Sequence, residues 1–213
     1  MILDAIYPSD ARVTNECEEL IKNGHEVYLF CVSFQKNYIK SEIINGIKVR
    51  RYYCSSLTYK LSALANDFPL YSILMKSKIK DFVNKNNIDR MHIHDIQIVK
   101  AAVDVCKKYN LKYTLDLHEN RHEIMKSYKH VNSFFGKLLI SFKRWKKAEE
   151  KYVSKAEKVI VVTNQAKKEI TERCKISNEN VVVYPNTVRK SFYQNKDYDQ
   201  ELKKKYTNNY VLL

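Results

Sequence analysis

The chain lacks the glycine-rich loops, closely spaced cysteine pairs and long apolar runs from which phosphate-binding loops, disulfide frameworks and membrane spans are built. It contains only 3 glycines, and neither G-x-G-x-x-G nor G-x-x-x-x-G-K-[ST] occurs, which excludes the two common glycine-rich nucleotide loops. Its 5 cysteines are odd in number, widely spaced and free of C-x-x-C pairs. Neither a disulfide framework nor a zinc knuckle is therefore expected, and we predict a reducing, cytoplasmic location.

Long apolar runs are missing as well. No stretch approaches the roughly 18 apolar residues of a membrane span, and the amino terminus lacks the basic-then-apolar layout of a signal peptide. Positive charge is abundant, with a formal net charge of +14 over 213 residues. This charge favours an anionic partner such as a phosphorylated substrate or an anionic membrane surface. Because no finger spacing, RNP-like strand or helix-turn-helix signature occurs, we expect no nucleic-acid partner.

Short apolar runs alternate with stretches whose apolar residues recur at spacings of three and four. The helical spacing is clear at 12–23 and 96–109. This alternation predicts an α/β fold, a Rossmann-like and mostly parallel sheet with helices on both faces. The predicted strands are residues 2–7, 26–32, 47–53, 90–94, 112–117, 158–163 and 180–185.

Glycine, asparagine and threonine mark several predicted boundaries. Gly24 fits the left-handed position just past a helix, and Asn45-Gly46 is typical of a type I′ turn between two strands. Thr163 or Asn164 can cap the helix that follows.

Polar residues gather where the predicted strands end. In open parallel sheets ligands bind at the carboxyl ends of the strands, so these side chains could share one site. The alternative is that they are caps and turns, since Asp, Asn, Ser and Thr are favoured there in any case. The residues are Ser9, Asp10, Arg12, His94, Asp95, His118, Glu119, Thr163, Asn164, Asn186 and Thr187.

His118, Glu119 and His122 spell H-E-x-x-H, a zinc-peptidase signature. That chemistry needs both histidines on one face of one helix. The alternating pattern of residues 112–117 instead predicts a strand that ends just before His118. We therefore interpret His118 as a strand-end histidine followed by the start of a helix, and we expect no metal site.

Residues 133–152, "SFFGKLLISFKRWKKAEEKY", combine an apolar stripe with many lysines. Such a basic amphipathic helix can lie on an anionic membrane, where it would suit a lipid-linked acceptor. The favoured alternative is a helix that packs its apolar stripe on the sheet and leaves its lysines in water.

Five motifs in order resemble glycosyltransferase family 4: "YPSDARVTNECEELIKNGHEVYLF", "DRMHIHD", "YTLDLHE", "EEKYVSKAEKVIVVT" and "NVVVYPNTV". The chain is similar to the acceptor-side, amino-terminal half of such enzymes, which have the GT-B fold. The resemblance implies one domain over residues 1–190. Residues 191–213 would be a linker and the truncated start of the donor-binding half.

The resemblance also implies roles for individual residues. His118 would lie beside the donor sugar, close to the reacting centre, and is the predicted catalytic residue. The acceptor side would be lined by His94, Asp95, Glu119 and Arg121. The donor side would hold Asp10 and Arg12 near the donor phosphates, with Asn186 in the P-N-T-V turn between the halves.

The activity implied is transfer of a sugar from a nucleoside diphosphate donor to a hydroxyl, with retention, in cell-surface polysaccharide or glycolipid synthesis. The nucleotide-sugar would be a substrate, and no cofactor is expected. The chain alone is expected to be inactive and cytoplasmic, with possible peripheral contact to the inner face of the membrane. The other hypotheses are a non-catalytic acceptor- or membrane-binding module and, more remotely, a zinc hydrolase.

Overall fold

The computed structural model describes residues 1–127, 131, 139–187 and 204–206. Its strands run in the order β2-β3-β1 in one group and β4-β5-β6-β7 in the other. All pairs are parallel except β2 with β3. The bounds are β1 Tyr28–Ser33, β2 Ser41–Ile44, β3 Ile47–Tyr53, β4 Arg90–His94, β5 Lys112–Leu117, β6 Lys158–Val161 and β7 Val181–Val183.

The amino terminus joins the two groups of strands. The Ile2 N–H donates to the His92 carbonyl at 2.7 Å, and the Leu3 N–H donates to the Phe30 carbonyl at 3.0 Å. The predicted strand at 2–7 is thereby reduced to a bridge at Ile2, because the chain bends away from the sheet from Asp4 onward. The α/β prediction is confirmed, with the first segment in the middle of the sheet.

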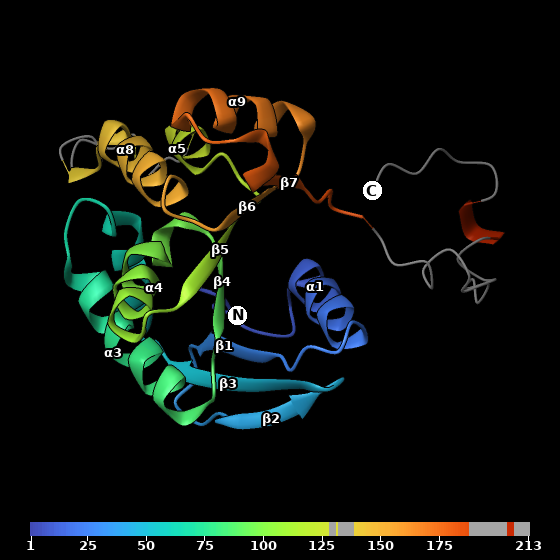
Figure 1. Ribbon diagram of the computed structural model, residues 1–213. Coiled ribbons are helices and arrows are strands. Elements are labelled where there is room, and N and C mark those ends of the chain that lie inside the picture. The colour runs from blue at the N-terminus through green and yellow to red at the C-terminus, as the bar shows by residue number, and fades with distance from the viewer. Residues whose placement is uncertain (128–130, 132–138, 188–203, 207–213) are drawn as a thin grey trace.

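Helices cover both faces of this sheet. Figure 1 shows α3 and α4 on one side of the strands and α1 on the other. The bounds are α1 Ala11–Lys22, α2 Ser56–Lys60, α3 Leu70–Lys85, α4 Ile96–Tyr109, α5 Arg121–Ile124, α8 Phe142–Val153 and α9 Asn164–Cys174, with 3-10 turns at Leu61–Leu64, Met125–Ser127 and Asn178–Asn180.

Two apolar clusters result, one on each face, because successive side chains of a strand point to opposite faces. Phe30 and Ile93 pack with α3 and α4, whereas Leu29 packs with Val13 and Cys17 of α1. Burial on both faces explains why several strands are nearly continuous apolar runs. It also means that a polar side chain on the α1 face is buried and needs a partner.

The predicted boundary residues have the expected conformations. Gly24 has φ +85°, its N–H donates to the Ile21 carbonyl, and the His25 N–H donates to the Leu20 carbonyl, which is a Schellman motif. Asn45 and Gly46 have φ of 49° and 83° between β2 and β3, as a type I′ turn requires. Thr163 caps α9 by accepting from the Ala166 N–H at 3.0 Å.

The amphipathic segment 133–152 is described only from residue 139 onward, and residues 133–138 lie outside the described part. Within the described part, α8 packs Trp145 and Tyr152 into the core, and Lys146 and Lys147 are exposed. The packed interpretation holds for this part of the segment. Among the described residues, no helix is long and apolar enough to span a bilayer.

Candidate functional site

The carboxyl ends of the strands surround a pocket of about 380 Å³. It lies between the start of α1, the end of β5 and the segment after β7. Five of the residues predicted from the sequence line it together, although they come from distant parts of the chain. The lining is Asp10, Ala11, Arg12, Asn15, His118, Tyr184, Pro185, Asn186 and Thr187.

Asp10 and Arg12 form the α1 side of the pocket. Asp10 caps the helix by accepting from the Arg12 and Val13 backbone N–H groups at 3.1 and 3.3 Å. The Arg12 guanidinium lies 3.2 Å from Asp10 and donates a short hydrogen bond to Asp116 of β5. Burial alone would raise the pKa of Asp10, but Arg12 and the Val13 N–H outweigh it and lower that pKa. The helix cap is thus held ionised, and Arg12 ties it to the sheet.

His118 follows directly after β5 and faces Asp95, which follows β4. The two side chains approach to 3.1 Å between His118 Nδ1 and Asp95 Oδ1, and each is about one-fifth exposed. Asp95 has φ 71° and ψ 144°, a conformation that residues other than glycine rarely adopt. Such backbone strain clusters at functional sites. Burial raises the Asp95 pKa to about 6, although His118 and Arg12 oppose the shift.

Glu119 and Arg121 extend the site away from the pocket. The Arg121 Nη1 donates to Glu119 Oε2 at 3.1 Å, and Glu119 Oε1 lies 4.0 Å from His118 Nε2. Carboxylates therefore stand near both ring nitrogens of His118. A histidine held in this way, beside an arginine, can orient a hydroxyl-rich ligand and share its proton.

His94 lies beneath the site and does not reach its surface. Its side chain is fully buried, with Nδ1 3.0 Å from Asp116 Oδ2. Burial, followed by the nearby Arg12, lowers the His94 pKa well below its usual value. The predicted direct contact of His94 with an acceptor is wrong for this arrangement, because β4 points its ring inward toward α1.

The H-E-x-x-H hypothesis fails on the backbone. His118 is outside any helix, and α5 begins only at Arg121. The two histidines therefore do not share one helical face, and the zinc-hydrolase interpretation loses its geometric basis.

Sequence reasoning missed two residues of the site, Asp116 and Tyr184. Asp116 falls on the polar side of the alternating pattern of residues 112–117, yet its side chain is buried and partnered by Arg12 and His94. A charged residue in a strand that is covered on both faces is the signal that could have revealed it. Tyr184, which lines the pocket just after β7, gave no comparable signal.

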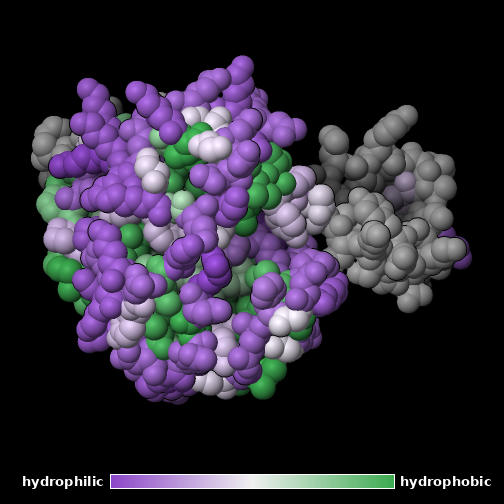
Figure 2. All heavy atoms as spheres, viewed as in Figure 1, coloured by the Kyte–Doolittle hydropathy of each residue, from purple (hydrophilic) through white to green (hydrophobic). Residues whose placement is uncertain are grey.

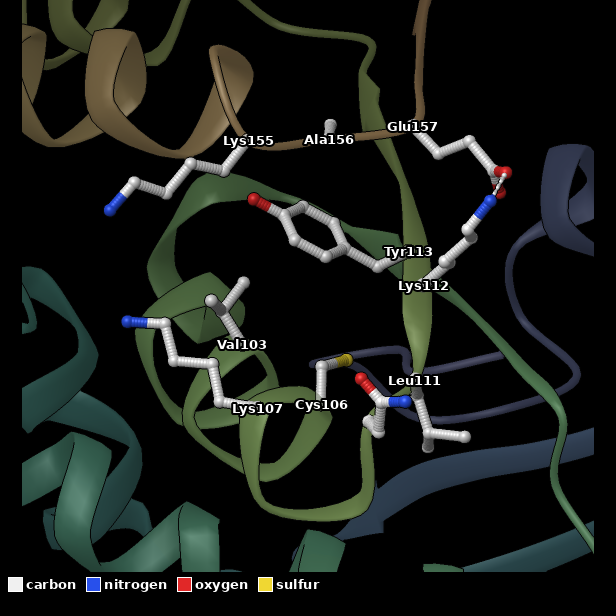
Figure 3. A pocket seen from close by; sticks show the side chains of 10 residues that line it. Val103, Cys106, Lys107, Leu111, Lys112, Tyr113, Lys155, Ala156 and Glu157 are labelled. Atoms are coloured by element: carbon white, nitrogen blue, oxygen red, sulfur yellow. Dashed lines mark hydrogen bonds and ion pairs between the residues drawn. The ribbon is translucent and has the colours of Figure 1, made fainter.

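Another pocket, of about 460 Å³, lies at the opposite ends of the strands (Figure 3). Tyr113 stands in its middle and donates to the Tyr152 carbonyl at 2.6 Å, and Lys112 pairs with Glu157. None of the predicted site residues line it. Since ligands of parallel sheets bind at the carboxyl ends, we assign this pocket no role in the site.

Comparison of the sequence with models of known protein families identifies the family of this chain. The model of Glycosyltransferase Family 4 matches residues 11–192, which is most of the chain. The chain belongs to Glycosyltransferase Family 4. Among curated proteins, no sequence matches it significantly.

Solved structures of GT-B glycosyltransferases have the same fold. Sucrose-phosphate synthase from Thermosynechococcus elongatus is 15% identical with TM-score 0.60, over 83% of this chain and 42% of that one. An Escherichia coli trehalose-6-phosphate synthase bound with UDP-2-fluoro glucose is 12% identical with TM-score 0.63, over 97% and 54%. The family 4 chain thus spans about half the length of these structures.

Proposed function

We propose that this chain is the acceptor-side half of a glycosyltransferase that moves a sugar from a nucleoside diphosphate donor to a hydroxyl, with retention. The observation that carries the proposal is the convergence of Arg12, His118 and Asn186 on one pocket at the carboxyl ends of the strands, in a chain of this family. The binding of UDP-2-fluoro glucose by one structural relative supports a nucleotide-sugar as donor.

The roles that we propose are those implied by the family resemblance, and the geometry of the pocket supports them. His118, which lies between Asp95 and Glu119, would position the sugar and the attacking hydroxyl. Asp10 and Arg12 would lie on the donor side, where the Arg12 guanidinium would exchange its Asp10 partner for an oxygen of the leaving diphosphate. Asp95, Glu119 and Arg121 would bind the acceptor, and Asn186 would mark the junction with the donor-binding half. The acceptor class we favour is a precursor of a cell-surface polysaccharide or glycolipid.

The proposal is tested by an assay of donor hydrolysis and transfer with UDP-, GDP- and ADP-sugars. It is run on the chain alone and on the chain extended by a donor-binding second half. We expect turnover with one donor class in the extended form and none in the chain alone. Sugar transfer by the 213-residue chain alone would refute the proposal that activity needs a separate donor-binding half.

A second proposal concerns peripheral contact with an anionic membrane. Leu70 and Ile73 at the start of α3 each expose 58% of their surface, and Phe68 lies beside Arg144 and Lys147 in a shallow pocket. Figure 2 shows hydrophobic residues, in green, scattered over the mainly hydrophilic face that it displays. Apolar side chains next to basic ones suit the interface of an anionic bilayer.

Vesicle co-sedimentation tests this contact. We expect the chain to pellet with phosphatidylglycerol vesicles and not with phosphatidylcholine vesicles, and the Leu70→Ser/Ile73→Ser variant to lose most of the binding. Ile43→Ser, at a 72% exposed position of β2, is the matched control and should bind as the wild type does. Equal losses in both variants would refute a contact through α3.

A further inference from the structure

Four side chains with metal-binding atoms meet under α1, one layer below the pocket. His92 and His94 are two residues apart on β4, so both rings point to the same face of the sheet and stack with centroids 4.5 Å apart. Glu16 reaches them from the buried face of α1, and Asp116 from β5. One ligand atom of each residue lies within 4.8 Å of those of all the others.

The separations approach those of a metal site. Glu16 Oε2 lies 3.5 Å from His92 Nε2 and 3.9 Å from His94 Nε2. Ligand atoms around a tetrahedral zinc ion are about 3.4 Å apart, given bonds of about 2.0–2.1 Å. Glu16 can therefore reach either histidine, but the two nearly parallel rings, with an interplanar angle of 17°, must turn toward each other before both Nε2 atoms point at one ion.

The same atoms have no hydrogen-bond partner. Both carboxylate oxygens of Glu16 and the Nε2 atoms of His92 and His94 are buried and unsatisfied. Leaving one buried polar atom unpaired costs on the order of 1–3 kcal/mol, and four unpaired atoms at one place are unusual in a native protein. One cation would satisfy at least three of them at once.

Asp116 and Arg12 complete the arrangement as an outer shell. Asp116 Oδ2 lies 3.0 Å from His94 Nδ1, which places the proton on Nδ1 and leaves the Nε2 lone pair directed at Glu16. Arg12 holds Asp116 from the other side. A carboxylate behind a ligating histidine is the usual device that fixes its tautomer and orientation.

We propose that Glu16, His92 and His94 form a binding site for a first-row divalent cation such as Zn²⁺, with Asp116 as the outer-shell partner of His94. Two imidazoles and one carboxylate are a ligand set that zinc and its neighbours accept. The ion would tie α1 to β4 and thereby fix the start of α1, where Asp10 is the cap and Arg12 lies in the first turn.

A proton is the rival occupant. A neutral Glu16 could donate to one histidine, because burial, with repulsion from Asp116 second, raises the Glu16 pKa to about 8. One proton would satisfy one oxygen and one nitrogen and leave the other histidine unpaired. A proton therefore leaves one histidine nitrogen without a partner, whereas a cation can contact both, and only the second case gives a metal-binding signal.

Cobalt binding to the chelator-treated 213-residue chain separates the two. We expect saturation at one Co²⁺ per chain, with visible ligand-field bands, no sulfur-to-cobalt charge-transfer band from the cysteines, and displacement by Zn²⁺. Glu16→Gln and His92→Gln should weaken binding by more than the about 10- to 100-fold that loss of an outer-shell partner such as Asp116 costs. His118→Ala and His25→Ala, outside the cluster, should bind as the wild type does.

Circular dichroism establishes that each variant is folded. If Glu16→Gln does not fold, His92→Gln decides alone, because its partly exposed side chain can be replaced with less loss of packing. No saturable cobalt signal would show that a proton alone occupies the cluster. Undiminished binding in folded His92→Gln would place the ion elsewhere, and either result overturns the proposal while leaving the transfer function untouched.

Discussion

Asp4 is a buried carboxyl group whose protonation is coupled to folding. It is 2% exposed, and Oδ1 accepts a short hydrogen bond from the Tyr71 hydroxyl, whereas Oδ2 has no partner. Burial raises the Asp4 pKa from 3.8 to about 7, although the Tyr71 hydrogen bond opposes the shift. Between these two pKa values the native state holds a proton that the unfolded state releases. Stability from this group is therefore full below pH 3.8 and falls as the pH rises to about 7.

Asp4→Asn should remove this dependence, because the amide mimics the protonated carboxyl and its oxygen can still accept from Tyr71. We expect the free energy of unfolding at pH 8 to rise by on the order of 2–4 kcal/mol, with little change at pH 4. Urea denaturation across this pH range measures it. Asp89→Asn, at an exposed position, is the control; equal pH profiles for Asp4→Asn and the wild type would contradict the buried-carboxyl account.

The start of α8 is anchored by one carboxylate. Asp67 is fully buried and accepts from the Ser141 N–H and the Trp145 indole N–H, each at 3.1 Å, while Arg144 Nε lies 2.7 Å away. Asp67→Ala would leave the indole and the backbone N–H unpaired in the core. We expect a loss of about 2–4 kcal/mol in the free energy of unfolding, since each orphaned group costs about 1–2 kcal/mol.

Urea denaturation followed by Trp145 fluorescence reports this loss, because Trp145 is the single tryptophan. Lys146→Ala, one residue on and exposed, should change stability by less than about 0.5 kcal/mol. A loss of similar size in both variants would mean that helix propensity, and not the Asp67 anchor, holds α8 in place.

Local patterns predicted the elements that local chemistry determines. The ranges 47–53, 90–94 and 112–117 match β3, β4 and β5, and 96–109 matches α4, because each combines a clear period with its own boundary residues. The helix α3 was not singled out, and the edge strand β2 was indicated only by the Asn45-Gly46 turn before β3. β2 is only 4 residues long, and α3 exposes Leu70 and Ile73, so neither presents one clean buried face.

The residues of the site also divide into those that local sequence patterns predict and those that only the folded molecule brings together. Asp10, Arg12, His118 and Asn186 were found because strand ends of a parallel sheet meet at one edge. Asp116 was missed because its partner Arg12 is 104 residues away, and Glu16 because only the packing of α1 on β4 brings it to the histidines. Contacts between residues that are far apart in the sequence produce no periodic pattern of polar and apolar residues, so the sequence pattern does not reveal them.

The central claim is that His118 positions the sugar and hydroxyl in the pocket at the carboxyl ends of the strands. The most direct measurement is the rate of sugar transfer by the extended, two-half protein carrying His118→Ala, with His25→Ala as the exposed control. We expect His118→Ala to lower kcat by about 100-fold or more, in line with the contribution of a positioned group, and the control to transfer sugar at the wild-type rate. A folded His118→Ala protein that transfers sugar at the wild-type rate would contradict it.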